Sequence, residues 1–579
     1  MKTFKNIYLI LTTIFVIGFT PSWIYCQNQL SVPLVLGLPI EKNIYSDNIT
    51  ITWNSNIKST GIVRFGKVDG AKLYTDSVSS NDNVTSHSIK LNNLIPATIY
   101  NCSVGSKDST GTGNSGNFLF STASPLSVSG AIWVYFSKYV NNSVSLGENA
   151  TVANLGSKFV ERINLAQYTI DISLYSLSGN VGTEIANALI SAKNRGVKVR
   201  FIGEEDNSTT SAMTLLKNSG VPFITDKFDT FASSGYMHNK FGIFDNRNSS
   251  SFEDDFIWTG SWNASDPGTN NDAQNVVIFQ DVALANAYTR EFEEMWGSST
   301  EIPNASLTRF GNRKTNNTPH RFMINNTPVE SYFSPSDGTT SQIYSCLSSS
   351  LSSINVCVLS FTRDDLSQII MQKKNQGIKT KVLMDNNSDT GNEYATLLNA
   401  GVDIFTRPSS FGGFFHHKYA IVDGDKTSLQ GKVVTGSHNW STSAENTNNE
   451  NTVIIQSNRI ANLFLQEFKA RYLDAGGKDN IIVTFVKHSE NGKQNSDFNI
   501  FPNPANPSTT FQINSSSESN AEIKIYSISG QLISTIFNQQ VQKGKYEVKF
   551  NTLSLSSGTY YCILSIDGKI KVSPLLICK

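Results

Sequence analysis

Two histidine–lysine pairs, each followed by an aspartate at the same distance, are the residues of this chain best suited to chemistry. Both units have the spacing His-x-Lys-x4-Asp, and their members are His238, Lys240 and Asp245, and His416, Lys418 and Asp423. A Gly-Ser-x-Asn turn follows each unit and supplies Ser261 and Asn263 in one case, and Ser437 and Asn439 in the other. One such unit would be a weak signal, whereas two matched units in one chain predict two half-sites that face each other.

The types of these residues indicate phosphoryl chemistry. Side chains two positions apart on a strand share a face, so His238 and Lys240 are expected to point into the site and Asn239 away from it. The same holds for the second pair, with His417 pointing away. Two imidazoles, two ammonium groups, amides and hydroxyls together match the negative charge of a phosphoryl transition state. We expect no metal or cofactor, because the lysines supply the charge that a metal supplies elsewhere.

In a two-step reaction, two histidines can have different roles. One must be neutral to attack phosphorus, and the other must be protonated to assist the leaving oxygen. Glu450 follows the second turn, and Gln274 stands at the corresponding place in the first half. If each reaches the histidine of its own half, Glu450 favours a protonated His416 and Gln274 leaves His238 free as nucleophile. Pairing across the halves would overturn this assignment.

The aspartates and the remaining histidines have other interpretations. Asp245 and Asp423 are candidates either for a direct catalytic role or for a structural role that closes a strand end. His417 is expected to be a supporting or core residue. Three further histidines stand in no motif and receive no role: His87, His320 and His488. No cysteine or acidic pair has the spacing of a metal site.

A repeated series of segments surrounds the two units. From about residue 130 to 474, β-rich runs alternate with helical patterns, which predicts a mixed or parallel sheet with helices outside it. The run IDISLYSLS at 170–178 recurs as INVCVLSFT at 354–362, and AKNRGVKVRFIGEE at 192–205 recurs as KKNQGIKTKVLMDN at 373–386. This order of matched segments predicts the duplication of a whole α/β domain.

Both flanks of the repeat have β patterns. Residues 30–125 alternate apolar and polar positions between turns, which predicts an antiparallel sandwich with Trp53 in its core. The run LNNLIPATIY resembles the corner turn of a fibronectin type III domain, which implies that the Tyr100 hydroxyl bonds back to upstream backbone. Residues 495–579 predict a second small β-sandwich. Residues 1–26 have the charged start and apolar run of a signal peptide, with lipidation at Cys26 as the alternative.

The duplicated unit resembles the phospholipase D superfamily. The resemblance implies two repeats, 127–300 and 325–480, that form a duplicated α-β-α sandwich between all-β modules. It implies that His238 and His416 are the nucleophile and acid/base pair. It also implies that the lysines and asparagines bind phosphate with support from the serines: Lys240, Lys418, Asn263, Asn439, Ser261 and Ser437. The second half is similar to the compact nuclease and mitochondrial-type branch, from which the first half departs at Trp262 and Gln274.

The flanking modules have resemblances of their own. Residues 30–125 resemble a fibronectin type III domain, which implies a spacer or docking module. Residues 495–579 resemble the C-terminal sorting domain of type IX secretion, on the opening NPANPST and the later SSGTYY. That resemblance implies export across an outer membrane by the type IX machinery, to the cell surface or beyond. An ordinary adhesive β-module is the alternative.

Composition limits the function further. The chain has 579 residues, which predicts three or four domains, and its formal net charge is zero. Zero net charge removes the global electrostatic argument for a nucleic-acid binder. Export permits disulfides, so Cys346 with Cys357 and Cys562 with Cys578 are candidate pairs, against buried free thiols.

Three functions remain open at this point. The leading one is a secreted phosphodiesterase that hydrolyses phospholipid headgroups through a phosphohistidine, as a monomer with both half-sites in one chain. The second is a secreted nuclease of the same superfamily. The third is an inactive cell-surface binding protein, which the intact motifs in both halves disfavour. Hydrolysis and transfer to another alcohol are not distinguished.

Overall fold

The computed structural model describes residues 32–577 except 69, 126–129, 233–234, 249–250, 480, 484–497, 516, 528–530, 554 and 567–568. The predicted signal peptide, with Cys26, therefore lies outside the described residues, as do His488 and Cys578. Residues 1–486 and 487–579 form two separate compact units. In the described part of the chain, no helix is long and apolar enough to cross a membrane.

The first unit opens with an antiparallel β module. Its strands are β1 (Val35–Lys42), β2 (Ile49–Lys67), β3 (Asp76–Leu91), β4 (Ile99–Lys107), β5 (Thr112–Asn114) and β6 (Phe118–Ser121). Trp53 is 3% exposed in its core. The Tyr100 hydroxyl accepts a hydrogen bond from the backbone N–H of Ile95 at 2.9 Å, as predicted. Strand β2 continues past Ser59, because shifts of register near this residue let one strand bend without ending.

Two eight-stranded sheets follow, and their strands have the same order except at one edge. The first sheet runs β11-β10-β9-β12-β13-β14-β7-β8 and the second runs β19-β18-β17-β20-β21-β22-β16-β15. The first-half strands are β7 (Ile132–Phe136), β8 (Thr151–Val152), β9 (Thr169–Leu174), β10 (Lys198–Gly203), β11 (Phe223–Thr225), β12 (Lys240–Phe244), β13 (Phe256–Gly260) and β14 (Asn275–Gln280). The second-half strands are β15 (Arg321–Ile324), β16 (Thr327–Ser334), β17 (Ser353–Val358), β18 (Lys379–Met384), β19 (Asp403–Thr406), β20 (Lys418–Val422), β21 (Lys432–Gly436) and β22 (Glu450–Gln456). The predicted duplication is thus a duplication of topology in seven strands. At the remaining edge, β8 follows β7 and lies parallel to it, whereas β15 precedes β16 and lies antiparallel to it.

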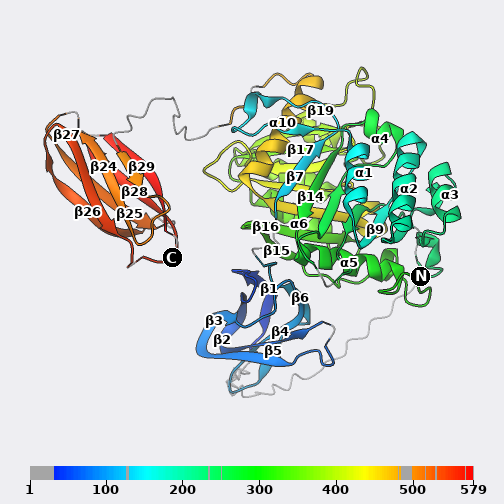
Figure 1. The fold of residues 1–579 in the computed structure, drawn as a ribbon, viewed down its shortest axis with the longest axis horizontal. Helices are drawn as coiled ribbons and strands as arrows, with labels where there is room; N and C mark the ends of the chain where they lie inside the picture. The colour runs from blue at the N-terminus through cyan, green and yellow to red at the C-terminus, as the bar shows by residue number, and fades with distance from the viewer. Residues whose placement is uncertain are drawn as a thin grey trace, which may run out of the picture. The chain divides into compact units, whose positions relative to one another are not determined.

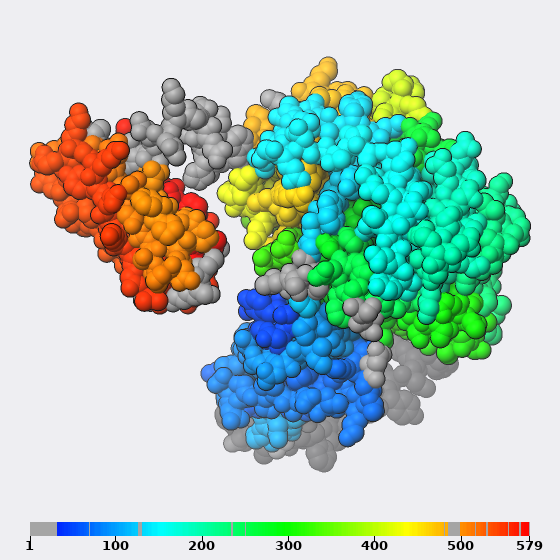
Figure 2. All heavy atoms as spheres, in the orientation of Figure 1, coloured from blue at the N-terminus to red at the C-terminus, as the bar shows by residue number. Residues whose placement is uncertain are grey.

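Helices complete the layers of this α/β core (Figure 1). One apolar cluster joins the first sheet to α1 (Leu155–Leu165), α2 (Gly179–Asn194) and α3 (Ser211–Asn218). Another joins the second sheet to α6 (Thr339–Ser348), α7 (Asp364–Asn375) and α8 (Tyr394–Asn399). The largest cluster contains residues of both sheets with α5 (Val282–Trp296) and α10 (Asn458–Asp474), so the halves share one core. Figure 2 accordingly shows the two halves, cyan to green and green to orange, as one continuous surface.

The remaining elements of the core are short. They are α4 (Asp266–Asn270) and α9 (Thr442–Asn446), with the 3-10 turns η1 (Asn142–Val144), η2 (Glu205–Asn207), η3 (Asp226–Phe228) and η4 (Gly311–Arg313). Helices α4 and α9 each follow a Gly-Ser-x-Asn turn. Each begins at a serine, Ser265 or Ser441, whose hydroxyl accepts from a backbone N–H of the first turn. These caps fix where the chain leaves each turn.

The strands that lead into the candidate site are fully buried. Every residue of β12, KFGIF, and of β20, KYAIV, is buried. Such near-continuous apolar runs suit central strands that are covered on both faces. Burial on both sides leaves these strands little freedom to move, so they are a rigid base for the polar residues at their ends.

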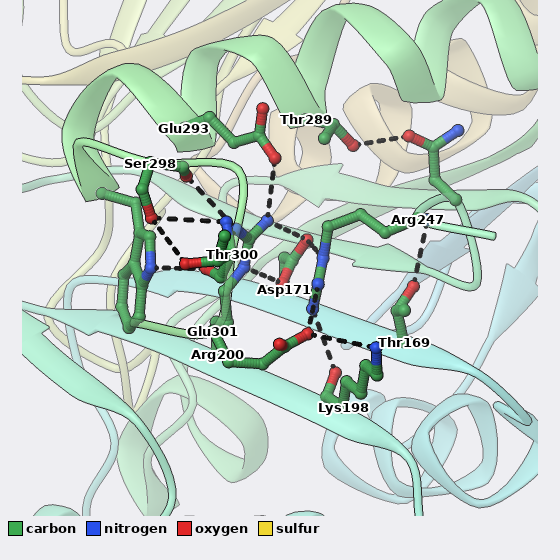
Figure 3. A network of polar contacts seen from close by, with 12 residues as sticks. Thr169, Asp171, Lys198, Arg200, Arg247, Thr289, Glu293, Ser298, Thr300 and Glu301 are labelled. Atoms are coloured by element: carbon green, nitrogen blue, oxygen red, sulfur yellow. Dashed lines mark hydrogen bonds and ion pairs between the residues drawn. The ribbon is translucent and has the colours of Figure 1, made fainter. Parts of the chain in front are cut away.

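An ion-pair network fixes the far end of β12 (Figure 3). Asp171 of β9 accepts from the Arg200 guanidinium at 2.7 and 2.8 Å and from Arg247 Nε at 2.8 Å. Arg247 also donates to Glu301 at 3.0 Å, and Arg200 donates to the backbone oxygen of Thr300 at 3.1 Å. Arg200 and Asp171 are almost fully buried, so each charge depends on the other for compensation. The network ties the turn after β12 to the segment after α5.

The second unit is a two-sheet β module. Strands β23 (Phe498–Phe501), β24 (Ser508–Ser515) and β27 (Gly544–Asn551) form one sheet. The other contains β26 (Leu532–Val541), β25 (Ser519–Ser527), β28 (Gly558–Ile566) and β29 (Lys569–Ile577). Among the candidate disulfide residues, Cys346, Cys357 and Cys562 are buried free thiols. Cys346 and Cys357 are therefore buried free thiols and do not form the candidate disulfide.

Candidate active site

Each histidine is anchored by the opposite half of the core. His238 and His416 lie two residues before β12 and β20, which begin at the lysines rather than at the histidines. The His238 N–H donates to the backbone oxygen of Asn449 at 3.0 Å, and the His416 N–H donates to that of Ala273 at 3.0 Å. These two reciprocal crossings bring the predicted half-sites together.

The imidazoles also take their side-chain partners from the opposite half. His238 Nδ1 lies 2.8 Å from Glu450 Oε2, and His416 Nδ1 lies 2.9 Å from Gln274 Oε1. The prediction that each group reaches the histidine of its own half is therefore wrong. The reason is geometric: the residue before Gln274 and the residue before Glu450 pair with the segment ahead of the opposite histidine, Ala273 with Phe415 and Asn449 with Met237. The Glu450 carboxylate therefore contacts His238, and the Gln274 amide contacts His416.

The lysines and serines complete both half-sites. Lys240 Nζ donates to the backbone oxygen of His238 at 2.9 Å, and Lys418 Nζ donates to that of His416 at 3.0 Å. Each serine binds the side chain that contacts the histidine of the opposite half. Ser261 Oγ donates to Gln274 Oε1 at 3.0 Å, and Ser437 Oγ donates to Glu450 Oε2 at 2.6 Å. The serines therefore orient the partners of the imidazoles.

Burial of several cationic groups together lowers their pKa values. Desolvation lowers the pKa of His238 to about 4, against the opposing effect of Glu450, and lowers that of Lys240 to about 7. Desolvation and neighbouring cations hold the pKa values of His416 and Lys418 well below their ordinary ranges. Burial alone would raise the pKa of Glu450, but His238 and Lys240 outweigh it and the net shift is downward. An anion bound among these groups would let them regain protons.

The asparagines of the two turns have side-chain amides that could bind a ligand. Asn263 Nδ2 lies 3.5 Å from His416 Nε2, which places it beside the reactive edge of the imidazole. The amide oxygens of Asn263 and Asn439 are buried and have no hydrogen-bond partner in the described part of the chain. Because a phosphodiester only accepts hydrogen bonds, the Nδ2 groups of these side chains are the atoms that can donate to it.

Glycine is required at the start of both turns. Gly260 and Gly436 have φ of +153° and +150°. A Cβ at these positions would lie 2.3 Å and 2.1 Å from the backbone oxygens of Asn275 and Asn451. The close approach of strands β13 and β21 to their neighbours therefore excludes any side chain here.

The aspartates of the two units do not reach the histidines. Asp245 accepts backbone N–H groups of Gln167, Tyr168 and Thr169 at 2.6 to 3.1 Å. Asp423 accepts those of Leu351, Ser352 and Ser353 over the same range. Each sits at the far end of its strand from the histidine, with positive φ, and closes the turn. The placement of Asp245 and Asp423 among catalytic residues is therefore corrected to the structural alternative.

Sequence reasoning missed two pairs of supporting residues. Glu204 Oε2 accepts the N–H of Met237 at 2.6 Å, and Asp385 Oδ1 accepts the N–H of Phe415 at 2.8 Å, so a carboxylate holds the residue before each histidine. Both carboxylates follow equivalent strands, β10 and β18, and the matched segments ending GEE and MDN contained that signal.

The second missed pair is Asn275 and Asn451, one residue after Gln274 and Glu450. Asn275 Nδ2 lies 2.9 Å from His417 Nδ1, while Asn451 accepts the Lys240 N–H at 2.9 Å. His417, fully buried and 3.0 Å from Glu467, is a supporting residue as expected. These contacts join the two halves beneath the reactive groups.

Comparisons with known proteins match both halves of the core. A family model described as "Cardiolipin synthase, PLD-like domain" matches residues 159–296 and 343–472, one segment in each half. The chain contains a duplicated phospholipase D-like domain. A second model, "Secretion system C-terminal sorting domain", matches residues 499–578. The N-terminal β module fits a fibronectin type III-like domain, and the fold class of an α/β core with flanking β modules is confirmed.

Relatives match parts of this phospholipase D-like chain. A mitochondrial cardiolipin hydrolase of Chlamydomonas reinhardtii is 27% identical over 138 residues, which are 24% of this chain and 58% of that protein. One of Xenopus tropicalis is 33% identical over 119 residues, 20% of this chain and 53% of its own. The matches thus span a little over half the length of these relatives. A solved phospholipase D family member, Nuc from Salmonella typhimurium, is 28% identical, with a TM-score of 0.23, over 26% of this chain and 95% of that one.

Proposed function

We propose that the two halves form one phosphodiesterase site, in which His416 is the nucleophile and His238 the acid and base. The observation that carries the proposal is the crossing of Glu450 to His238 and of Gln274 to His416. A carboxylate stabilises an imidazolium, whereas a neutral amide does not. When an anionic diester raises the pKa of both rings, His238 takes the proton first and His416 keeps a free lone pair.

The reaction then proceeds in two balanced steps. His416 Nε2 forms a bond to phosphorus, the bond to the leaving alcohol breaks, and that alcohol takes a proton from His238. Water next gives a proton to His238 and attacks phosphorus, and the bond between phosphorus and His416 breaks. Lys240, Lys418, Asn263 and Asn439 face the charge on the phosphoryl oxygens in both steps. Hydrolysis regenerates both imidazoles.

The rim of the site favours a phospholipid over a nucleic acid as the substrate. Tyr236 and Phe414 stand at equivalent positions, two residues before each histidine, and are 46% and 49% exposed. Phe231, in the same segment as Tyr236, is 78% exposed. Exposed aromatic side chains on both sides of one site suit the interface of a lipid surface. We therefore propose a phospholipase D-type hydrolase that acts outside the cell after export through its sorting domain.

The proposal is tested by incubating the full chain with phosphatidylcholine vesicles and with plasmid DNA in the presence of a chelator. Wild-type protein should release the headgroup, and His238→Ala and His416→Ala should each abolish that release. His320→Ala, at a histidine outside the site, is the control. Cleavage of DNA alone, lost in the same two variants, would replace the lipid substrate with a nucleic acid. Turnover of neither substrate would contradict the proposed activity.

A further inference from the structure

The two Gly-Ser-x-Asn turns differ at the buried position between the serine and the asparagine. Trp262 occupies this position in the first half and His438 occupies it in the second, and the two residues are 1% and 2% exposed. Each stands directly before an asparagine of the proposed phosphate site. The same position therefore holds a neutral side chain in one half and a titratable one in the other.

The partners of these two side chains differ in the same way. Trp262 Nε1 donates to Thr269 Oγ1 at 3.0 Å. His438 Nε2 instead lies 3.3 Å from Glu445 Oε2. Thr269 and Glu445 are counterparts, because each is the fourth residue after the serine that caps its short helix, α4 or α9. A neutral hydrogen bond in the first half is thus replaced in the second by a pair that becomes an ion pair when His438 carries a proton.

Glu445 also holds the start of α6. Its Oε2 accepts from the Thr340 N–H at 2.9 Å and from the Thr340 hydroxyl at 2.7 Å. Burial alone would raise the pKa of Glu445, but its contacts with His438 and Thr340 outweigh burial and the net shift is downward. Glu445 is therefore a fixed anion against which the His438 ring is positioned.

The direction of the Asn439 side chain depends on the backbone of this turn. Its amide oxygen has no hydrogen-bond partner among the described residues. Its backbone oxygen accepts from the N–H of Ser441, which caps the helix that carries Glu445. The contact of His438 with Glu445 joins the turn to the same helix a second time. The strength of that contact therefore affects where the Asn439 amide points.

The other charged groups near the pair have partners of their own. Glu450, at the start of β22, lies within electrostatic range of His438, and the imidazole and serine described above already bind its carboxylate. Arg363, before α7, lies within range of Glu445 and donates to Asp365 at 3.0 Å. The proton on His438 therefore decides whether this contact is an ion pair.

We propose that the His438–Glu445 ion pair holds Asn439 in position at the phosphate, so that turnover at this site decreases as the pH rises and His438 loses its proton. This proposal rests on the phosphodiesterase function above and adds a regulation of the same site. His438 is a positioning residue, because it acts through Asn439 and not on the reacting atoms. Its contribution is complete where it is protonated and is lost on the alkaline side, within the range of about pH 5 to 8 in which histidines change charge.

Replacement of His438 by a neutral donor isolates the effect of its charge. The full chain is assayed with bis(p-nitrophenyl) phosphate at several values from pH 5 to pH 8, with alkali added to each sample before p-nitrophenolate is read. Wild-type kcat/KM should exceed that of His438→Gln by roughly tenfold at pH 5, the order of the difference between a charged and a neutral contact, and should approach it at pH 8. The ratio of the two proteins removes the pH dependence that both have through His238 and His416.

A double variant tests the same idea with the pair that the first half already contains. His438→Trp combined with Glu445→Thr copies the neutral contact of that half, so its kcat/KM should keep a constant ratio to that of His438→Gln at every pH. If His438→Gln does not fold, the ratio of wild type to the double variant should fall with pH in the same way. His320→Gln, at a histidine outside the site, is the control and should keep the wild-type profile. Thermal unfolding at both ends of the pH range checks that each variant is folded.

The possible failures are distinguishable. A ratio of wild type to His438→Gln that stays constant or rises between pH 5 and pH 8 would overturn the regulation and leave the phosphodiesterase function standing. A lower Tm with a constant ratio would likewise leave the pair a structural contact only. Absence of aryl diester hydrolysis by the wild type would contradict the proposed function itself.

Discussion

At the residue scale, the site depends on one difference between otherwise matched halves. Glu450 and Gln274 occupy equivalent places, yet one carries a charge and the other does not. Both are completely buried, and both are held by a serine of their own half. Because water does not screen a charge at such a position, this single difference can separate the roles of the two imidazoles.

Replacement of the carboxylate tests that separation. Glu450→Gln should lower the pKa of His238 further and slow release of an alkyl headgroup by roughly 100-fold, the usual contribution of a general acid. The burst of p-nitrophenol from an aryl diester should fall much less, because p-nitrophenolate leaves without a proton. Stopped-flow measurement of the burst and steady-state assay of headgroup release give the comparison. Equal losses for both leaving groups would contradict the assignment of His238 as acid.

Glu204 provides a prediction about pH and stability. Burial and the neighbouring Asp226 raise its pKa to about 7 in the folded protein, above the ordinary value of 4.5, so folding favours its protonated form. Its contribution to stability is therefore complete below pH 4.5 and is lost as the pH rises through 7. Glu204→Gln should raise Tm relative to wild type at pH 8 and by less at pH 5. Thermal unfolding at the two values measures this, with the exposed Glu184→Gln as control; an equal change at both would refute it.

At the element scale, β12 and β20 separate the chemical end of each unit from its structural end. The histidine precedes the strand, and the aspartate follows it and binds three backbone N–H groups. The His-x-Lys-x4-Asp spacing is thus the length of one buried strand with a functional group at one end and a turn-closing group at the other.

Asp423→Asn distinguishes these ends. The amide loses the charge that three backbone donors bind, so the variant should lose about 1 to 3 kcal/mol of folding stability. Its kcat at a temperature where it is folded should stay within a few-fold of wild type. Urea unfolding and diester hydrolysis measure the two quantities. A stable variant with a severe loss of kcat would restore a catalytic role for the aspartate.

Sequence reasoning found the units and the duplication because both are local patterns repeated in order. It could not find which imidazole meets Glu450, since that contact depends on how the halves pack and not on spacing within either half. It missed Glu204 and Asp385 for a related reason. Each acts on a backbone N–H that is distant in sequence, from the end of a neighbouring strand.

At the scale of the whole molecule, the N-terminal β module and the core belong to one compact unit, and residues 487–579 form another. The N-terminal β module contacts the core directly: Glu41 pairs with Arg321 at 2.7 Å, and Ala97 accepts from Asn286 at 2.9 Å. Residues 487–579 form a compact unit of their own and match a sorting domain. Catalysis and export are therefore assigned to different units.

Deletion of residues 487–579 tests this division. The shortened protein should hydrolyse an aryl diester with an unchanged kcat, because every residue of the proposed site lies in the other unit. In the bacterium that makes it, the shortened protein should no longer reach the cell surface or medium. Activity of purified protein and immunodetection in cell fractions are the measurements. A shortened protein that reaches the medium at the wild-type level would contradict the role of the sorting domain.

The central claim is that the two halves make one site with His416 as nucleophile and His238 as acid and base. Its most direct test is intact-mass and peptide analysis of His238→Asn after brief reaction with bis(p-nitrophenyl) phosphate and alkaline quenching. The leaving group needs no proton, so the first step should proceed, and the second should stall without a base. We expect a phosphoryl adduct on His416 that is absent from His416→Asn. An adduct on His238 in His416→Asn, or full turnover without an adduct in either variant, would contradict it.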